Sequence, residues 1–427
     1  MLLKPGRACG HGAGSTRLKD LPMTRPEKLG FSSERLGKLD AFLQTRYVEA
    51  GRIPCAQVLI SRRGERVHET LLGQADRERG KAVATDTLFR IYSMTKPITS
   101  LAFMMLVEEG LVALDDPVSR FIPEWKNLGV FAAGVTPQFM TTPPTRPMQM
   151  VDLLRHTSGL TYGFQNRGNV DAAYRKLKIA DTHGLDFDAF VAELAKLPLE
   201  FSPGEAWNYS ISTDVLGVLV ERISGLPFQT FLQTRIFDPL KMTDTGFQVR
   251  EDQKPRFAAC YNATPTGGLT LQDDPETSPY LTAPNFHSGG GGLVSTAKDY
   301  MAFCQMLGNG GVLDGQRLIA PKTLRLMASN HLPGGQDLTD LSRSLFSEAT
   351  NAGVGFGLGF AVTFDPVKAM LTSSPGEYYW GGAASTAFWI DPVEDIQVVF
   401  MTQVLPSSSY PIRRELRTLV YSALVEP

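Results

Sequence analysis

The stretch that decides the fold is Leu88-Phe89-Arg90-Ile91-Tyr92-Ser93-Met94-Thr95-Lys96-Pro97. Residues 88–92 have the composition of a short strand, and residues 97–106 carry apolar side chains at helical spacing behind a proline that a first helical turn tolerates. A serine and a lysine three residues apart at the start of a helix share one face. The Lys96 nitrogen can therefore reach the Ser93 hydroxyl, which is the arrangement of an activated nucleophile.

Composition places the 427-residue chain among ordinary globular proteins, with 43% hydrophobic and 20% charged residues. Its length predicts about two to three domain-sized cores, or one large fold with an insertion. The 42 basic and 44 acidic residues are interspersed, and the formal net charge is -2. Because no basic patch marks a site for nucleic acid or for an anionic membrane, we expect neither partner.

Cysteine and histidine spacings do not match the common metal sites. The four cysteines, at 9, 55, 260 and 304, form no Cys-x-x-Cys pair, and the six histidines show no metal-ligand spacing. We expect no metal, no cofactor and reduced or incidental thiols. Residues 1–24 lack the apolar core of ~7 to 15 residues that a secretion signal needs. The prediction is a cytoplasmic protein whose residues 1–24 form a flexible extension.

Strand patterns occur at both ends of the chain, and helical patterns lie between them. The predicted strands are 56–61, 66–72, 88–92, 356–364, 378–380, 387–391 and 396–402. The predicted helices are 33–49, 150–155, 187–197, 213–224, 228–237, 297–307 and 412–424, and 136–147, with four prolines, is expected to be an irregular loop. This order predicts an α/β domain from residues 25–115 and 288–427, with a mostly helical domain, 116–287, inserted between its halves.

Five motifs follow one another along the chain. They are Ser93-Met94-Thr95-Lys96; Leu153-Leu154-Arg155-His156-Thr157-Ser158-Gly159-Leu160; Phe201-Ser202-Pro203-Gly204 with Asn208-Tyr209-Ser210; Gly291-Gly292-Leu293-Val294-Ser295-Thr296-Ala297; and Trp380-Gly381-Gly382. From Pro26 to the C-terminus the chain resembles the serine β-lactamase and penicillin-binding protein superfamily. It is most similar to the family VIII carboxylesterases, whose fold resembles class C β-lactamase. The resemblance implies a β-lactamase-like fold of class α/β plus all-α, with an antiparallel sheet flanked by helices and a helical insertion domain.

The chain departs from the β-lactamase pattern at two motifs. Ile211 stands where the second motif would supply an asparagine, and Trp380 stands where Lys-Thr-Gly would supply a lysine. The missing amide and cation are groups that would meet a β-lactam side chain and carboxylate. Both departures favour neutral esters.

The resemblance also assigns the catalytic roles. Ser93 would be the nucleophile, and Lys96 with Tyr209 would take its proton as a pair, so that the base is not assigned to one member. Tyr209 would return a proton to the leaving alkoxide. The backbone N–H groups of Ser93 and Ala383 would form the oxyanion hole.

Pocket residues are expected around this centre. Tyr92 is expected to bind substrate. Trp207, Tyr378, Tyr379 and Trp380 could each be a wall of the substrate pocket or a buried aromatic plug. Gly381 and Gly382 would let a substrate lie close to a strand without side chains. His156 is expected to be structural, and the glycine run 289–292 to be close-packed backbone beside the site, because it lacks the context of a phosphate-binding loop.

The predicted function is a serine carboxylesterase acting on small-molecule, short-chain or aromatic carboxylic esters. Alternatives with the same nucleophile are a β-lactamase, a D-amino-acid peptidase and an acyltransferase. A non-catalytic binding or scaffold member would be marked by loss of Ser93, Lys96 or Tyr209, and all three are present. No Gly-x-Ser-x-Gly motif occurs, so a nucleophile elbow has no candidate serine. The sequence leaves the physiological ester and the oligomeric state open.

Overall fold

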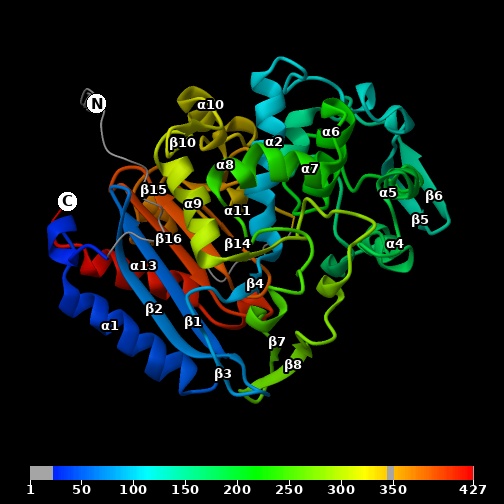
Figure 1. The fold of residues 1–427 in the computed structure, drawn as a ribbon. Helices are drawn as coiled ribbons and strands as arrows, with labels where there is room; N and C mark the ends of the chain where they lie inside the picture. Colours follow the sequence, from blue (N-terminus) through cyan, green and yellow to red (C-terminus); the bar gives the residue numbers. More distant parts are fainter. Residues whose placement is uncertain (1–22, 344–350, 427) are drawn as a thin grey trace.

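A computed structural model describes residues 23–343 and 351–426, so most of the predicted extension 1–24 lies outside the described residues. Its main feature is an antiparallel sheet of eight described strands (Figure 1). Their order across the sheet is β12 (Val354–Phe356), β13 (Ala361–Thr363), β14 (Glu377–Gly381), β15 (Ala387–Asp391), β16 (Ile396–Met401), β1 (Cys55–Arg62), β2 (Glu65–Asp76) and β3 (Lys81–Ala82). The sheet thus joins strands from both ends of the chain, as the sequence predicts, with β1 beside β16.

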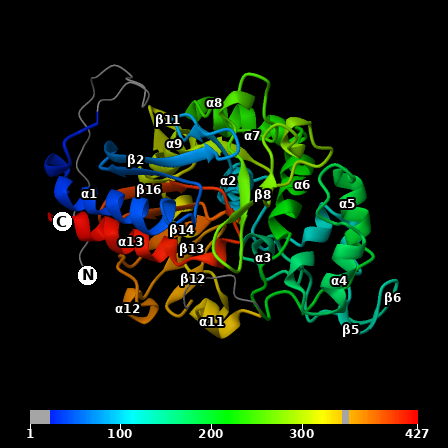
Figure 2. The same ribbon diagram turned by 90° about the horizontal axis from the view of Figure 1, so that it is seen from below.

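Helices cover both faces of this sheet, which is why β1 is buried along its whole length. On one face lie α1 (Ser33–Leu43) and α13 (Ile412–Ala423), packed on the side that carries Val58 and Ile60 (Figure 2). The opposite face carries Leu59 into a second core with α2 (Thr95–Glu108) and α9 (Ala297–Gly308). Alternate β1 side chains therefore enter different cores, as the strand period of two requires.

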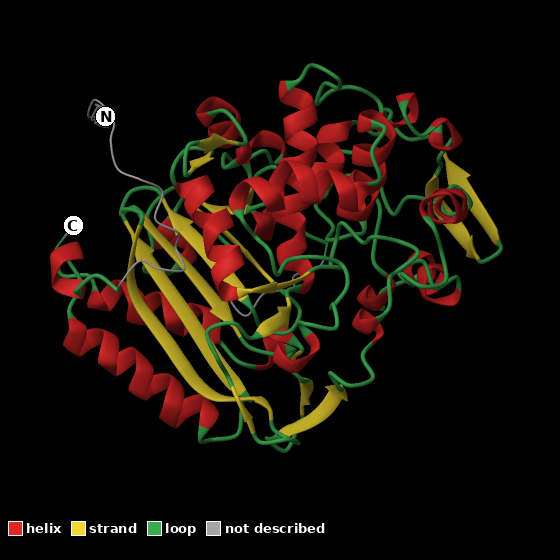
Figure 3. Ribbon diagram, in the orientation of Figure 1, coloured by secondary structure: helices red, strands yellow, loops and turns green. Residues whose placement is uncertain are grey.

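The remaining helices and short sheets complete the molecule (Figure 3). The helices are α3 (Met150–Leu154), α4 (Asn169–Lys176), α5 (Phe187–Leu194), α6 (Ser212–Ser224), α7 (Phe228–Leu232), α8 (Asp238–Leu240), α10 (Pro321–Met327), α11 (Leu338–Leu341) and α12 (Pro366–Ala369). The short sheets are β4 (Leu88–Arg90) with β9 (Val294–Thr296), β5 (Val130–Val135) with β6 (Gln138–Thr142), β10 (Val312–Leu313) with β11 (Gln316–Arg317), and β7 (Cys260–Ala263) with β8 (Leu269–Asp273) and β17 (Val404–Leu405). The β-lactamase-like arrangement of an antiparallel sheet, flanking helices and a helical part is the predicted one.

The prediction of an irregular loop at 136–147 is wrong in its first half. Residues 130–142 form the hairpin β5–β6, which projects at the edge of the helical part (Figure 1). Pro137 lies in the turn, and the other three prolines follow the second strand, so none of them interrupts the pairing. The prolines mark the ends of strands here.

One predicted helix and two predicted strands also differ from the structure. The α-helix predicted over 33–49 ends at Leu43 and continues as a π-helical turn, Gln44–Val48. The strand predicted over 88–92 ends at Arg90, where its pairing with β9 stops, and Ile91 leads into a 3-10 turn, Tyr92–Met94, ahead of α2. The single strand predicted over 356–364 is instead the antiparallel pair β12 and β13.

Among the described residues, no single helix combines the length and apolar character needed to cross a membrane. Only the pair Ser212–Ser224 and Phe228–Leu240, bent by 83° where they join, meets that test together, by length and composition alone. Cys55, Cys260 and Cys304 are free and buried.

Candidate active site

The segment that carries the candidate nucleophile turns sharply before α2. Tyr92 has a φ of 42°, in the left-handed region that non-glycine residues rarely adopt. The turn is fixed on both sides, because Ile91 N–H donates to Leu293 O at 3.1 Å and Tyr300 O–H donates to Met94 O at 2.9 Å. This turn presents Ser93 at the N-terminal end of α2.

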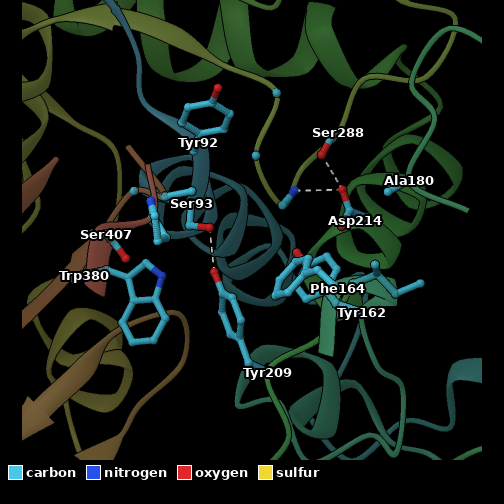
Figure 4. A pocket seen from close by; sticks show the side chains of 18 of the residues that line it. Tyr92, Ser93, Tyr162, Phe164, Ala180, Tyr209, Asp214, Ser288, Trp380 and Ser407 are labelled. Carbon is cyan, nitrogen blue, oxygen red and sulfur yellow. Dashed lines mark hydrogen bonds between the residues drawn. The ribbon is translucent and has the colours of Figure 1, made fainter. Parts of the chain in front are cut away.

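Two side chains converge on this serine, Lys96 from the adjoining helix and Tyr209 from a distant part of the chain, and Figure 4 shows the Tyr209 contact. Lys96 Nζ lies 3.2 Å from Ser93 Oγ, and the Tyr209 hydroxyl donates to the same oxygen at 2.6 Å. The lysine nitrogen also lies 4.5 Å from the centre of the Tyr209 ring. The convergence expected from the motif order is therefore present in the structure.

Lys96 is held behind the serine and is only 2% exposed. Besides Ser93 it donates to the Tyr162 hydroxyl at 3.0 Å and to the Gly290 carbonyl at 2.6 Å. An ammonium group has three N–H donors, and three acceptors surround this one. The nitrogen is thereby fixed in position.

Aromatic side chains support Tyr209. Its ring centre lies 5.0 Å from that of His156, 5.5 Å from that of Trp380 and 6.1 Å from that of Trp207, which is nearly parallel to it. Burial, and then the neighbouring Lys96 charge, hold the pKa of His156 well below its ordinary value. His156 is therefore a neutral packing partner beneath the tyrosine, in keeping with the structural role expected for it.

A buried ion-pair network orders the loop that carries His156. Asp152 accepts from Arg146 at 2.6 and 2.8 Å, from Arg155 at 3.1 Å and from Thr157 Oγ1 at 2.8 Å. Burial would raise the pKa of this carboxyl, but the bonds from Arg146 and from the Gln149 N–H, with the charges of both arginines, leave it below 3.8. The network ties α3 to the loop under Tyr209.

Replacement of Asp152 by asparagine should lower the free energy of unfolding by about 3 kcal/mol, because it leaves buried arginine charge without its carboxylate. The folded-state pKa is depressed, so this contribution is present above the unfolded-state value of 3.8 and is lost as the pH falls toward the folded-state value. Urea denaturation of Asp152→Asn and wild type at pH 7 measures the difference. Equal midpoints would contradict the assigned role.

The glycine run packs tightly against the site. A Cβ on Gly290 would lie 2.4 Å from Asp214 Oδ2 and 2.9 Å from the Tyr162 hydroxyl, and one on Gly289 would lie 2.6 Å from Thr213 O. Only glycine lets this backbone reach Lys96. The run is close-packed backbone, as the sequence analysis expects.

Tyr162 and Asp214 belong to the site but were not predicted from the sequence. Tyr162 lies two residues beyond the second quoted motif, and Asp214 lies in the first turn of α6, whose residues 212–220 are all buried. A carboxyl group inside an otherwise buried helix is an unusual placement that could have drawn attention to Asp214. Its Oδ1 accepts from Ser288 Oγ at 2.5 Å and from Gly290 N–H at 3.0 Å (Figure 4).

The end of β14 lies against the nucleophile segment. A Cβ on Gly382 would lie 2.5 Å from Ile91 O, and one on Gly381 would lie 2.6 Å from Cζ of Arg413. The two glycines therefore bring the strand against neighbouring protein groups, in addition to lining the cavity. Arg413 Nη2 donates to Gly382 O at 2.6 Å, which fixes the turn before Ala383.

A cavity of about 800 Å³ opens in front of these groups. Among the residues that line it are the predicted Tyr92, Ser93, Trp207, Tyr209, Trp380, Gly381, Gly382 and Ala383. Much of the remaining wall is aromatic, including Phe164, Phe247 and Phe286. Of the predicted site residues, only Lys96 does not line the cavity; it contacts Ser93, which does.

Comparisons with known proteins agree with this architecture. A family model described as Beta-lactamase matches residues 41–422. Esterase EstB of Burkholderia gladioli is 32% identical over 405 residues, covering 90% of this chain and 95% of its own. Protein Rv1367c of Mycobacterium tuberculosis is 37% identical over 364 residues, covering 84% of this chain and 88% of its own.

One solved structure adds a functional description. EstCE1, described as a hydrolase with promiscuous acyltransferase activity, superimposes with a TM-score of 0.76 at 27% identity. The match covers 91% of this chain and 99% of that one.

Proposed function

The chain belongs to the Beta-lactamase family, a family of serine hydrolases, and we propose that it is a carboxylesterase that works through a Ser93 acyl-enzyme. The observation that carries the proposal is the convergence of Lys96 Nζ and the Tyr209 hydroxyl on Ser93 Oγ, at 3.2 and 2.6 Å. A hydroxyl next to two such groups can lose its proton as it attacks.

In the first step Ser93 Oγ bonds to the ester carbonyl carbon, and its proton passes to the Lys96 and Tyr209 pair. The carbonyl oxygen becomes an oxyanion, for which the N–H groups of Ser93 and Ala383 are the proposed donors. Collapse of this intermediate breaks the bond to the alcohol, and Tyr209 returns the proton to the leaving alkoxide. Water then repeats the sequence on the acyl-enzyme and releases the acid.

The cavity wall supports the proposed substrate class. Trp207 and Trp380 both pack against Tyr209, and further aromatic residues extend the wall. Such a wall favours short acyl chains and aromatic rings by stacking and apolar burial. Trp380 places an indole where a lysine would meet a β-lactam carboxylate, which argues for neutral esters over anionic lactams.

Acyl transfer to an alcohol is a second candidate function. The cavity volume of about 800 Å³ leaves room for an acceptor beside a small acyl group, and the related EstCE1 is described as having acyltransferase activity. An alcohol in place of water in the second step would give a new ester by the same chemistry.

A panel of p-nitrophenyl esters, from acetyl to long acyl and benzoyl, tests the proposal when it is run beside the cephalosporin nitrocefin. We expect short acyl and benzoyl esters to be turned over faster than long acyl esters, and nitrocefin to be turned over much more slowly than any of them. Adding a primary alcohol should divert part of the acyl group into a new ester if the second candidate is right. Faster turnover of nitrocefin than of every ester would overturn the proposed substrate class.

A further inference from the structure

Lys96 carries a buried positive charge, and none of its three direct partners carries a negative charge to neutralise it. Ser93, Tyr162 and Gly290 are uncharged acceptors, and Lys96 is 2% exposed. A buried cation is costly unless an anion or a dense set of acceptors compensates it. The structure places one acid nearby.

Asp214 is the only carboxylate among the described residues that line the cavity. It is 4% exposed and hydrogen-bonds the Tyr162 hydroxyl, the group that in turn accepts from Lys96. Its Oδ1 accepts from the N–H of Gly290, whose carbonyl accepts from Lys96 at 2.6 Å. Two hydrogen-bonded bridges therefore join this carboxylate to the lysine, one through the Tyr162 hydroxyl and one through the backbone of Gly290.

We propose that Asp214 is a positioning residue that serves as the counter-charge of Lys96, acting through the Tyr162 hydroxyl and the Gly290 peptide. The inference rests on the proposed function, because it concerns the charge state of the pair that takes the Ser93 proton. The carboxylate orients both bridges: the Tyr162 hydroxyl donates to it and keeps its oxygen toward the ammonium, and the Gly290 N–H donates to it while the carbonyl of the same residue, in the next peptide, accepts from the ammonium. It also attracts the Lys96 charge electrostatically.

The electrostatic surroundings support this assignment. Burial raises the pKa of the Asp214 carboxyl, and the Lys96 charge is the largest influence that opposes it. Burial, followed by the Asp214 charge, raises the pKa of Tyr162 well above its ordinary value, so this hydroxyl stays protonated. The carboxylate and the ammonium thus interact across a hydroxyl that does not itself ionise.

Two histidines near the site keep one charge state in the working range. They are His156, whose ring centre lies 5.0 Å from that of Tyr209, and His287, which precedes Ser288, a donor to Asp214. Burial lowers the pKa of both imidazoles, with a contribution from Lys96 at His156, so both are neutral near pH 7. The cation that acts on Asp214 is Lys96.

The test measures the rate at which a fluorophosphonate probe labels Ser93 between pH 5 and 10, which requires no ester substrate. Removing a negative charge makes a proton leave its neighbours more readily, so Asp214→Asn should move the pH profile to lower pH by about one unit or more. The matched control is Asp299→Asn, a second buried acid that does not line the cavity. It should leave the position of the profile unchanged.

Each outcome decides one point. A profile for Asp214→Asn that coincides in pH with those of wild type and Asp299→Asn would overturn the counter-charge role, even if labelling were slower. If circular dichroism shows that Asp214→Asn does not fold, Tyr162→Phe is the second test variant. Its Ser93 should be labelled about tenfold more slowly or worse, because the lysine loses its hydroxyl link to Asp214. Labelling of Tyr162→Phe at the wild-type rate would overturn the proposal. Labelling that persists in Ser93→Ala would instead refute the proposed function.

Discussion

Replacement of Ser93 by alanine should reduce kcat for p-nitrophenyl acetate by about four orders of magnitude or more, because no acyl-enzyme can form without the hydroxyl. The rest of the cavity wall is unchanged, so substrate binding should persist. Initial rates at saturating ester measure the effect. This is the largest change that we expect from any single substitution.

The matched control is Ser100→Ala, which alters a buried serine on the same helix, outside the cavity lining. Ser100→Ala should turn over esters at close to the wild-type rate. Equal turnover by Ser93→Ala and Ser100→Ala would assign the hydrolysis to another group and remove the nucleophile from the proposal.

Replacement of Tyr209 by phenylalanine should lower kcat by a factor of about 10² to 10⁴, the usual range for loss of a general acid or base. The variant removes one oxygen, the donor to Ser93 Oγ at 2.6 Å, and keeps the ring in contact with Trp207 and Trp380. KM should therefore change little, and the loss should fall on kcat. Steady-state kinetics separate the two parameters.

A second buried tyrosine provides the control for this variant. Tyr174 lies on α4 and does not line the cavity. Tyr174→Phe loses a hydroxyl of the same kind and should retain wild-type kcat and KM. If Tyr209→Phe behaved like Tyr174→Phe, the phenol would be a packing residue and the proton transfer would need another carrier.

The sequence predicts the nucleophile and its lysine because their relation is local. Ser93 and Lys96 lie three residues apart across the start of α2, and helix geometry brings them together whatever the rest of the chain does. Tyr209 is more than a hundred residues away in sequence, and only the order of the motifs connects it with Ser93. The structure brings its hydroxyl to the serine, while its catalytic role stays a prediction.

The groups around Lys96 could not be predicted in the same way. The Gly290 carbonyl is a backbone atom, and its contact with the lysine depends on how the glycine run packs against α6. Asp214 reaches Lys96 only through Tyr162, so no fixed spacing between residues in the sequence indicates its role. Contacts of this kind arise from tertiary packing, which cannot be predicted from any one local sequence pattern.

The same distinction holds for the fold. Strands can be predicted from short local sequence patterns, and the prediction of a sheet assembled from strands at both ends of the chain is confirmed. The pairing of β17 with β7 was not predicted, because each strand is short and its partner is far away in sequence. The predicted cytoplasmic location, the absence of nucleic-acid and membrane partners, and the domain borders at 115 and 288 stay predictions.

The central claim is that catalysis passes through a covalent ester on Ser93. The most direct measurement is mass spectrometry of the protein quenched in acid during turnover of a slow aromatic ester, followed by proteolysis. We predict that the peptide containing Ser93 gains the mass of one acyl group and that the gain is absent in Ser93→Ala. Acylation confined to a different residue, or steady turnover with no acylated peptide in wild type under any quench condition, would contradict the claim.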